Sequence, residues 1–398
     1  MATLLDPDRA LELVLERSPV PVPERRPLGR ALGAVLLEPV RAVVAQPPFD
    51  KSMMDGFAVR VADAGHAVRC GAIVAAGSTT DTKVEAGTAV EIMTGAPCPA
   101  GTEAVVEVED VVRDGDRVTL PSRIEPGQHV QPRGRLCAAG HVVLPAGSVL
   151  TSVGIASAAA VGVAEVVVPS APTVAVVTTG DELAAAGAPL GPAQIHESNG
   201  VMLEALARLA GAAEVLRLHA ADTEGSLREA IARASDADVV VLSGGVSMGR
   251  HDLVPKVLEA TGWTRVFHKV AQKPGKPIFF GVDGARLVFG LPGTPLGSHV
   301  GFHRYVAAAL RKRLGRDPMC PTHHGRLAAD WTSSGSRTLF RLARAVRGAQ
   351  GWVIDLLEWG GSSDLVGPAR ANCYLRLPPG THRLQAGDSI PFELLDGA

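Results

Sequence analysis

Three carboxylates follow apolar stretches in the middle of the sequence and could hold a cation. Glu182 comes after VAVVTTG, Asp222 ends VLRLHAAD, and Asp252 lies beyond DVVVLSGG. If these stretches are parallel strands of one sheet, the residues that follow them share the edge where open α/β sheets bind ligands. Carboxylates repel one another unless a cation lies between them, and oxygen-only ligation beside phosphate suits Mg²⁺. The pattern therefore predicts a metal site formed by Glu182, Asp222 and Asp252.

Each of these carboxylates also has a structural interpretation. Asp222 precedes the helical stretch TEGSLREAIARAS, and by composition it is the better candidate for the N-cap of that helix. Glu182 and Asp252 could be acidic residues in the first turn of a helix, where they complement the helix dipole. The sequence leaves both interpretations open, and the convergence of the three acids on one edge is what favours the metal site.

The same edge carries groups that could bind an anion. In the turn formed by Ser243, Gly244 and Gly245, glycine lets successive backbone N–H groups face an oxyanion. Lys273 and Lys276 lie in the segment QKPGKP, where proline and glycine stiffen the loop and would fix two ammonium groups beside a phosphate. A tight turn and a solvated basic loop are the alternative interpretations of these two segments.

Residues 47–58, PPFDKSMMDGFA, form a second dense segment, with two aspartates, two prolines and a glycine ahead of the strand-like AVRVAD. The segment shows neither helical nor strand periodicity, so it is predicted to be a loop. Binding residues concentrate on loops that a rigid scaffold holds in place. A segment of this density is therefore expected to have a function beyond connecting two elements.

Four regions that differ in their pattern of apolar, glycine and proline residues would position these side chains. An amphipathic helix, with leucines at helical spacing, precedes the Pro-rich stretch SPVPVPERRP. From about 41 to 149, short apolar runs alternate with Gly, Pro and Asp clusters, which predicts a β-rich region with a hairpin turn at 113–116. After Pro169, strands alternate with helical stretches, which predicts a mostly parallel sheet covered on both faces. From about Pro318, short strands return in a small β domain.

Composition limits the class of protein. At 398 residues with 46% hydrophobic content, two to four domains are expected. The 39 basic and 41 acidic residues nearly cancel, which argues against binding nucleic acid or anionic lipid. The first 18 residues predict an amphipathic helix interrupted by charges rather than a signal peptide. The sequence has no apolar stretch of about 18 residues, so a membrane span is not expected. Five cysteines without CxxC spacing and twelve histidines without HxH or HExxH spacing predict a cytoplasmic protein with no zinc signature and no metal on its histidines.

Seven motifs in order resemble those of the molybdopterin molybdenumtransferase family, of the MoeA and gephyrin E-domain type. They are PPFDKSMMDGFAVR, MTGAP at 93–97, TTGDEL at 178–183, SNG at 198–200, SGGVSMG at 243–249, KPGKP at 273–277 and LPGTP at 291–295. The resemblance extends from the first helix to the C-terminal GGSSDLVGPARANC, which is nearly the whole chain. No single motif carries it, but seven in order make chance an inadequate explanation.

The resemblance implies a multidomain α/β plus β fold with a central, mostly parallel α/β domain. Its implied domains are an elongated dimerisation domain of residues 1–46 and 139–170, a β-rich domain of 47–138, an α/β molybdopterin-binding domain of 171–317 and a C-terminal β-barrel of 318–398. It also implies a homodimer. The active site would lie between the α/β domain of one subunit and the Asp55 loop of the other.

The implied reaction takes adenylated molybdopterin and molybdate, releases AMP, and leaves molybdenum on the dithiolene sulfurs with the help of Mg²⁺. A molybdopterin adenylyltransferase and molybdoenzymes would be the pathway partners. The implied catalytic residues are Asp55, Glu182, Asp222 and Asp252, the last three also as metal ligands. The implied substrate-binding residues are Thr94, Ser243, Gly244, Gly245, Lys273, Lys276, Pro292, Pro295 and Ser362.

Within this set, the resemblance implies distinct tasks. Lys273, Lys276 and the turn that begins at Ser243 would hold phosphate oxygens, while the three carboxylates would position the cation and the molybdate. Asp55 and Thr94 would close the site from the partner subunit. The prolines of LPGTP would shape the loop that approaches the pterin.

The sequence departs from the family pattern near the expected site. In PRGRLCAAG, Leu136 stands where the family usually has an aspartate, and Leu cannot ligate a metal. The usual asparagine of LPGNPxS is Thr294, and the small hydroxyl residue of that motif falls at Gly297, with Ser298 adjacent. These changes bear on activity more than on fold.

Other functions remain possible on the sequence alone. A molybdopterin adenylyltransferase or a nucleotide hydrolase with a similar α/β domain would not need the first 170 residues or the Asp55 loop. A divergent paralogue could bind molybdopterin without turnover or act as a scaffold, although the chain has no low-complexity linker. A molybdate store would need cationic donors more than the three acids present at the predicted edge.

Overall fold

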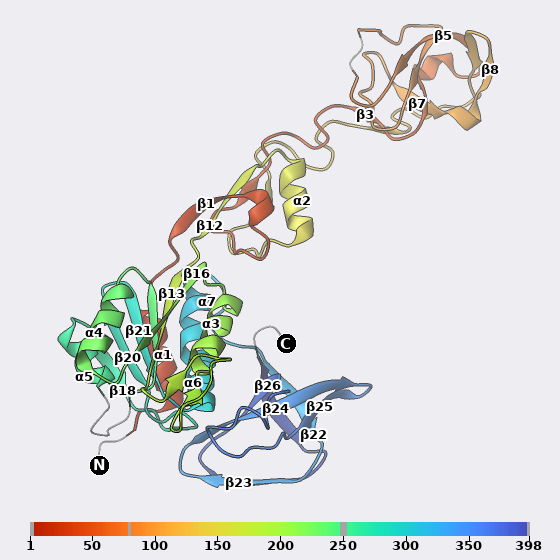
Figure 1. The fold of residues 1–398 in the computed structure, drawn as a ribbon. Coiled ribbons are helices and arrows are strands. Elements are labelled where there is room, and N and C mark those ends of the chain that lie inside the picture. Colours follow the sequence, from red (N-terminus) through yellow and green to blue (C-terminus); the bar gives the residue numbers. More distant parts are fainter. Residues whose placement is uncertain (1–3, 79–80, 247–252, 396–398) are drawn as a thin grey trace. The chain divides into compact units, whose positions relative to one another are not determined.

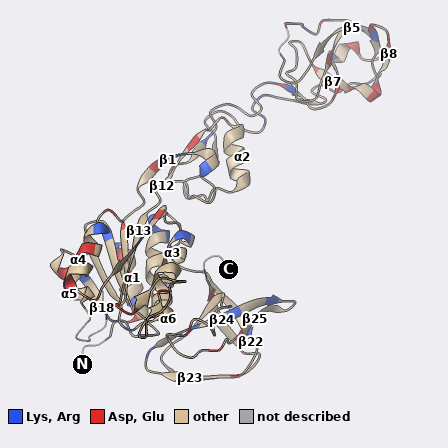
Figure 2. Ribbon diagram, viewed as in Figure 1, with Lys and Arg blue, Asp and Glu red and all other residues tan. Residues whose placement is uncertain are grey.

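The structure, a computed structural model, describes residues 4–78, 81–246 and 253–395 (Figure 1). The chain divides into a smaller unit, Arg25–Val168, and a larger unit that combines Met1–Glu24 with Pro169–Ala398. Basic and acidic residues are interspersed along the chain (Figure 2), in keeping with their nearly equal numbers. Among the described helices, none has the length and apolar character needed to cross a membrane.

The larger unit is built on a sheet of six strands in the order β16-β13-β17-β21-β20-β18. The first four strands are parallel, and β20 and β18 continue the sheet antiparallel. Their bounds are β13 (Thr173–Thr179), β16 (Glu214–Ala220), β17 (Val239–Ser243), β18 (Thr264–His268), β20 (Phe279–Asp283) and β21 (Arg286–Leu291). The predicted, mostly parallel sheet is confirmed.

Helices cover both faces of this sheet (Figure 1). Successive side chains of a strand point to opposite faces. Val174 and Val176 therefore share a core with α1, α3 and α7, whereas Ala175 and Val177 share a core with α4 and α5. The bounds are α1 (Pro7–Arg17), α3 (Asn199–Leu209), α4 (Glu224–Arg233), α5 (Val254–Ala260), α6 (Pro295–Gly301), the π-helix η4 (Phe302–Val306) and α7 (Ala307–Arg313).

Helix α1 belongs to the core of the larger unit, where Ala10 and Leu11 are buried. Its Asp8 carboxylate forms an ion pair with Arg304 of the π-helix. This packing differs from the predicted placement of residues 1–46 in a single elongated domain. The physical reason is the apolar stripe of the helix. Packing this stripe against the sheet removes it from water and completes the helical layer on that face.

Five strands of the C-terminal region close into a ring, β24-β25-β22-β28-β26, because β26 pairs back with β24. The ring encloses an apolar core that includes Leu327, Ile354 and Phe392, and it confirms the predicted β-barrel. The short strand β19 (Gln272–Lys273) pairs with β24 and joins the barrel to the α/β part. The other bounds are β22 (Thr322–Leu327), β23 (Trp331–Gly335), β24 (Thr338–Gly348), β25 (Gly351–Asp355), β26 (Cys373–Leu377), β27 (Gly380–Leu384) and β28 (Ser389–Leu394).

The smaller unit carries a six-stranded sheet in the order β7-β4-β6-β5-β9-β8, so the predicted β-rich region is confirmed. The predicted hairpin at 113–116 joins β8 to β9, with Asp114 opposite Arg117 and Gly115 at a φ of 57°. The bounds are β4 (Gly56–Val59), β5 (Ala67–Val74), β6 (Thr88–Ile92), β7 (Ala104–Glu107), β8 (Val112–Asp114) and β9 (Arg117–Thr119).

A second core of the smaller unit combines an early and a late segment of the chain. Leu28 and Leu36 pack with Leu150, Ala158 and Val166. The short strands of this unit form antiparallel pairs of β2 with β11 and of β3 with β10, while β1 pairs with β12. The bounds are β1 (Pro23–Pro27), β2 (Val40–Arg41), β3 (Lys51–Ser52), β10 (Val130–Gln131), β11 (Val142–Leu144), α2 (Ser152–Ala160) and β12 (Glu165–Pro169).

Candidate functional site

Two cavities open in the larger unit at the carboxyl edge of the parallel strands, and Gly245 and Gly293 line both. The larger cavity has a volume of about 680 Å³ and lies between the α/β part and the barrel. The smaller cavity, of about 270 Å³, is lined by the residues that follow β13, β16 and β17. This is the edge at which the sequence predicts ligand binding.

Glu182 and Asp222 both line the smaller cavity, as the convergence argument expects. The predicted N-cap role of Asp222 is wrong, because Thr223 caps α4 and its side chain accepts a hydrogen bond from the Ser226 N–H. The Asp222 backbone N–H instead donates to Asp181 Oδ1 at 3.1 Å. The Asp222 carboxylate is therefore not used by the helix and is exposed to the cavity.

Glu182 lies in the turn between β13 and β14 (Leu183–Ala184) rather than in the first turn of a helix, so that structural interpretation is wrong. Its carboxylate folds over Gly180, where a Cβ would come within 2.5 Å of Glu182 Oε2. Gly180 has a φ of 150°. The third predicted acid, Asp252, lies outside the described residues.

The donor set at the smaller cavity is compatible with Mg²⁺. Over the described ranges, neither Glu182 nor Asp222 belongs to a group of three ligand residues close enough to enclose an ion. Mg²⁺ does not need such a group, since it keeps several waters and uses one or two carboxylates together with substrate phosphates. Glu182 and Asp222 are the described residues that would hold it, and it would supply neutralisation of phosphate charge.

The turn after β17 is part of a hydrogen-bonded loop junction. Ser243 is buried, and its Oγ lies 2.9 Å from Ser298 Oγ and accepts from Asn199 Nδ2 at 2.9 Å. The Asn199 amide also donates to the Gly293 carbonyl at 2.8 Å, and Ser298 Oγ donates to the Pro292 carbonyl at 2.6 Å. Three segments of the sheet edge are thereby tied to the loop Pro292–Gly293, which lines the larger cavity.

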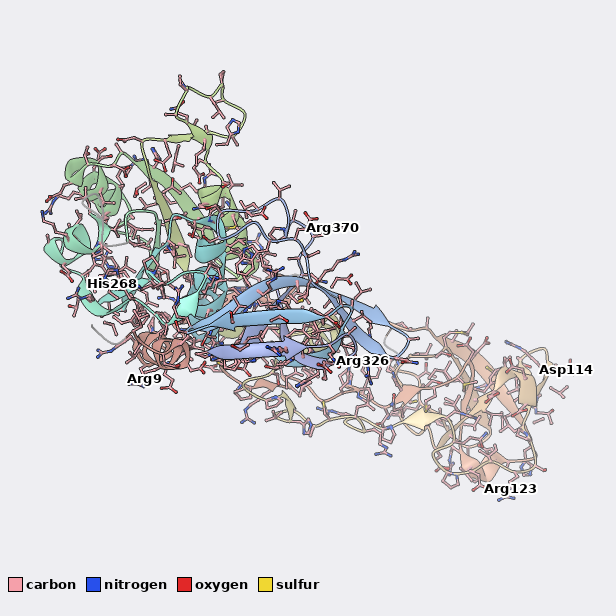
Figure 3. The ribbon with its side chains drawn as sticks, turned by 90° about the horizontal axis from the view of Figure 1, so that it is seen from below. Arg9, Asp114, Arg123, His268, Arg326 and Arg370 are labelled. Carbon is pink, nitrogen blue, oxygen red and sulfur yellow. The ribbon has the colours of Figure 1, made fainter. Side chains whose placement is uncertain are left out.

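The two glycines of this turn have different surroundings. Gly244 has a φ of 104°, and its N–H donates to the Leu291 carbonyl at 3.2 Å, so this N–H does not face the cavities. Gly245 has a φ of 63° and lines both cavities. Val246, the next lining residue of the larger cavity, has its carbonyl oxygen 2.8 Å from Nε2 of His268, labelled in Figure 3.

The two predicted lysines separate in the structure. Lys273 lines the larger cavity, with its Nζ 5.8 Å from the ring centroid of Trp359. Lys276 is exposed and is not among the residues that line either cavity. Arg337 brings a second cation to the larger cavity from the barrel, and its Nη1 donates to the Gln272 carbonyl at 3.0 Å.

The barrel loop that contains Gly360 and Ser362 forms another wall of the larger cavity. Asp364 holds this loop, because its Oδ2 accepts from the Gly360 N–H at 2.8 Å and its Oδ1 accepts from the N–H groups of Val366 and Gly367, each at 2.9 Å. These backbone donors, first those of Gly360 and Gly367, lower the pKa of the Asp364 carboxyl group below its usual value. Ser362, which is predicted to bind substrate, is thus on a loop that the charged carboxylate of Asp364 holds in place.

In the smaller unit, Asp55 and Thr94 lie together, as the family resemblance implies. Asp55 Oδ1 accepts from both the backbone N–H and the hydroxyl of Thr94, each at 2.6 Å. The hydroxyl bond and then the backbone bond lower the pKa of the Asp55 carboxyl group. An exposed, ionised Asp55 with a fixed orientation is the result.

Three family models match successive parts of the chain. Residues 5–162 match the MoeA N-terminal region (domain I and II). Residues 175–312 match the probable molybdopterin binding domain, and residues 324–395 match the MoeA C-terminal region (domain IV). The order of the three matches is the order of the motifs along the sequence.

Molybdopterin molybdenumtransferase 2 of Mycobacterium tuberculosis is 35% identical over 378 residues, which cover 92% of this chain and 93% of that protein. The chain belongs to the molybdopterin molybdenumtransferase family. The family member from Staphylococcus aureus is 32% identical, over 93% of this chain and 90% of its own. The crystal structure of the molybdopterin biosynthesis MoeA protein from Pyrococcus horikosii has 30% identity, a TM-score of 0.86 and full coverage of both chains. The resemblance is confirmed, and the chain has a role in molybdenum cofactor biosynthesis.

The departures from the molybdenumtransferase pattern fall in two places. Leu136 is on the smaller unit and is 67% exposed. Thr294 and Gly297 are on the larger unit, and a Cβ at Gly297 would lie 2.6 Å from Thr294 Oγ1. The hydroxyl of Thr294 therefore occupies the space that a side chain at Gly297 would need.

Several residues that line the cavities or support the loop between them are not assigned a role by the sequence motifs. Asn199 belongs to SNG, and a polar residue at the start of a helix beside a strand end is a recognisable signal. Ser298 stands in the sequence only as the neighbour of Gly297. Arg337 and Trp359 come from the barrel and have no local motif, so sequence spacing gave no sign of them.

Proposed function

We propose that the chain is a molybdopterin molybdenumtransferase, which inserts molybdate into adenylated molybdopterin with release of AMP and with the help of Mg²⁺. The observation that carries this proposal is the pair of adjacent cavities, which share Gly245 and Gly293 and are lined by side chains of opposite charge. Lys273 and Arg337 line the larger cavity, whereas Glu182 and Asp222 line the smaller one. The names of the curated relatives, molybdopterin molybdenumtransferases from two organisms, support the same reaction.

The larger cavity suits the anionic parts of the reaction. An ammonium group, a guanidinium group and the loop of Ser362 surround a space of about 680 Å³, which is large enough for a pterin with an oxyanion. Arginine and lysine bind oxyanions by charge-assisted hydrogen bonds. In the proposal, Lys273 and Arg337 hold phosphate or molybdate oxygens, and Lys276 has a lesser part because it lines neither cavity.

The smaller cavity suits the cation and the leaving group. Glu182 and Asp222 would hold Mg²⁺ together with Asp252 and substrate oxygens, and the bound ion would supply neutralisation of the phosphoanhydride charge. Gly245 lines both cavities, so a substrate bound in one would lie beside the other. Pro292 and Pro295 would shape the loop between them.

The proposed working form is a cytoplasmic homodimer with the four domains that the family resemblance implies, except that α1 belongs to the α/β part. Asp55 and Thr94 would close the site of the partner subunit. The exposed apolar side chains of Phe49, Met53 and Met54 on the Asp55 loop support a protein contact there, since their exposed fractions are 40%, 51% and 36%. A molybdopterin adenylyltransferase would supply the substrate, and molybdoenzymes would take the product.

The proposal is tested by incubating the purified protein with adenylated molybdopterin and Mg²⁺, with and without molybdate. Molybdate-dependent release of AMP, together with reconstitution of a cofactor-free molybdoenzyme, is expected. Glu182→Gln should slow AMP release at least tenfold, while the matched control Glu229→Gln, on the exposed face of α4, should not. Substrate that stays bound and intact in the wild type would refute turnover and identify a divergent binding paralogue, with Leu136 as the first residue to restore to aspartate.

A further inference from the structure

A second group of ligand-type side chains lies away from both cavities. His303 is buried in the π-helix, Cys320 is half-buried in the segment between α7 and β22, and Glu393 is on β28 of the barrel. Their ligand atoms all lie within 4.8 Å of one another. Over residues 4–78, 81–246 and 253–395, no other group of three His, Cys, Asp or Glu side chains converges this closely.

The distances between these atoms are slightly longer than those around a bound metal ion. His303 Nε2 is 3.6 Å from Glu393 Oε2 and 3.9 Å from Cys320 Sγ. A normal N–H···O hydrogen bond is about 2.9 Å long, so the imidazole and the carboxylate are too far apart to share one. Zinc bonds of about 2.0 to 2.3 Å in a tetrahedron place neighbouring ligand atoms roughly 3.4 to 3.6 Å apart. A small inward shift of the three side chains would produce that geometry.

The arrangement does not fit a nucleophilic triad. In such a triad the thiol and the acid contact different nitrogens of the imidazole, so that one orients the ring while the other exchanges a proton. Here both Cys320 Sγ and Glu393 Oε2 face the same atom, His303 Nε2. Three groups that converge on one point, rather than in a line, are typical of metal ligands.

We propose that His303, Cys320 and Glu393 form a binding site for one Zn²⁺ ion, with water in the fourth position. One imidazole nitrogen, one thiolate and one carboxylate oxygen are the ligand types that zinc takes in proteins. The thiolate and the carboxylate balance the charge of the ion. Arg304 does not compete for the same oxygen, since its Nη1 lies 3.8 Å from Glu393 Oε1, not Oε2.

The ion would join three elements that meet at the boundary between the α/β part and the barrel. The π-helix continues α6, which begins at Pro295 in the lining of the smaller cavity, and β28 belongs to the closed ring of the barrel. π-helical turns occur frequently at functional sites because the extra residue redirects a side chain. A metal bridge from His303 to Glu393 would hold together the two walls that carry Lys273 and Arg337.

Titration of the metal-free, full-length protein with Co²⁺ tests this site directly. We expect one equivalent to produce a thiolate-to-cobalt charge-transfer band, together with the intense visible bands of a tetrahedral ion. Cys320→Ser should abolish the charge-transfer band. Cys137 is also half-buried but belongs to the smaller unit, so Cys137→Ser should leave the band unchanged. Glu182→Gln should also leave it unchanged, which separates this site from the proposed Mg²⁺ site.

A thermal measurement provides the second readout. Zn²⁺ should raise the melting temperature of the wild type and of Cys137→Ser, because an ion that binds only the folded state stabilises it, but not that of Cys320→Ser. Cys320 is half-buried and lies outside the helices and strands, so its replacement by serine is expected to leave the fold intact. A charge-transfer band that survives Cys320→Ser, or its absence in the wild type, would overturn the proposal and leave His303 and Glu393 as an ion pair.

Discussion

Ser298→Ala would test whether the loop between the two cavities is held by the serine pair beneath it. Ser298 is fully buried, and its Oγ donates to the Pro292 carbonyl at 2.6 Å and lies 2.9 Å from Ser243 Oγ. The substitution removes one oxygen atom and leaves the rest of the core unchanged. The Pro292 carbonyl can still accept a longer hydrogen bond from Ser243 Oγ, at 3.3 Å, so its hydrogen bonding is weakened but not lost.

The size of the effect follows from the number of bonds lost. A buried hydrogen bond contributes about 1 kcal/mol net when no group is left without a partner. We therefore expect the folded loop to lose about 1 kcal/mol. If the loop must be in its present position to bind substrate, the KM for adenylated molybdopterin should rise by a factor of roughly 5.

Ser18→Ala is a matched control for this experiment. Ser18 is also buried, its Oγ donates to the Val14 carbonyl at 2.8 Å, and that carbonyl likewise keeps a second donor, the Ser18 N–H at 2.9 Å. Ser18 ends α1 and lines neither cavity. Both variants should lower the melting temperature slightly, but only Ser298→Ala should raise KM. An unchanged KM in Ser298→Ala, with a fall in stability equal to that of Ser18→Ala, would refute the reasoning.

Three further predictions concern the walls of the larger cavity. Lys273→Ala should raise the KM for molybdate about tenfold or more, whereas Lys276→Ala should change it less than about threefold, because only Lys273 lines the cavity. Gly297→Ser should cost about 1 to 3 kcal/mol of stability through crowding against Thr294, and Thr294→Ala in the same chain should recover part of that loss in thermal melts. The lowered pKa of Asp364 means that its stabilising contribution is present above the usual carboxyl pKa and is lost as pH falls through the folded-state value. The melting temperatures of Asp364→Asn and wild type should therefore differ at neutral pH and converge in acid, and a difference independent of pH would contradict this.

The parts of the fold that depend on local pattern were predictable. The alternation of strands and helices after Pro169 is enough to predict a parallel sheet, because each strand must be buried on both faces. The hairpin at 113–116 is set by its own turn residues. By contrast, the placement of α1 depends on an apolar face that could cover any exposed core, and its sequence does not specify which one.

The residues of the candidate site likewise divide into those that local pattern predicts and those that depend on long-range packing. The positions of Glu182 and Asp222 follow from sheet geometry, since residues after parallel strands meet at one edge. Composition alone favours Asp222 as the cap of α4, but Asp and Thr are both good caps and stand next to each other, so only the backbone decides in favour of Thr223. Arg337 reaches the larger cavity because the barrel packs there, and long-range packing of this kind leaves no trace in residue spacing.

The departures at Thr294 and Gly297 show why substitutions near a site should not be judged one at a time. Taken singly, each replaces a polar residue of the family pattern and suggests loss of function. The structure places the hydroxyl of Thr294 2.6 Å from where a Cβ at Gly297 would be, so a side chain at Gly297 would force the Thr294 side chain to move. The buried hydroxyl that ties the loop to Ser243 comes from Ser298 instead. The two changes therefore act as one rearrangement that keeps the loop Pro292–Gly293 supported, and they argue less strongly against activity than the exposed Leu136 does.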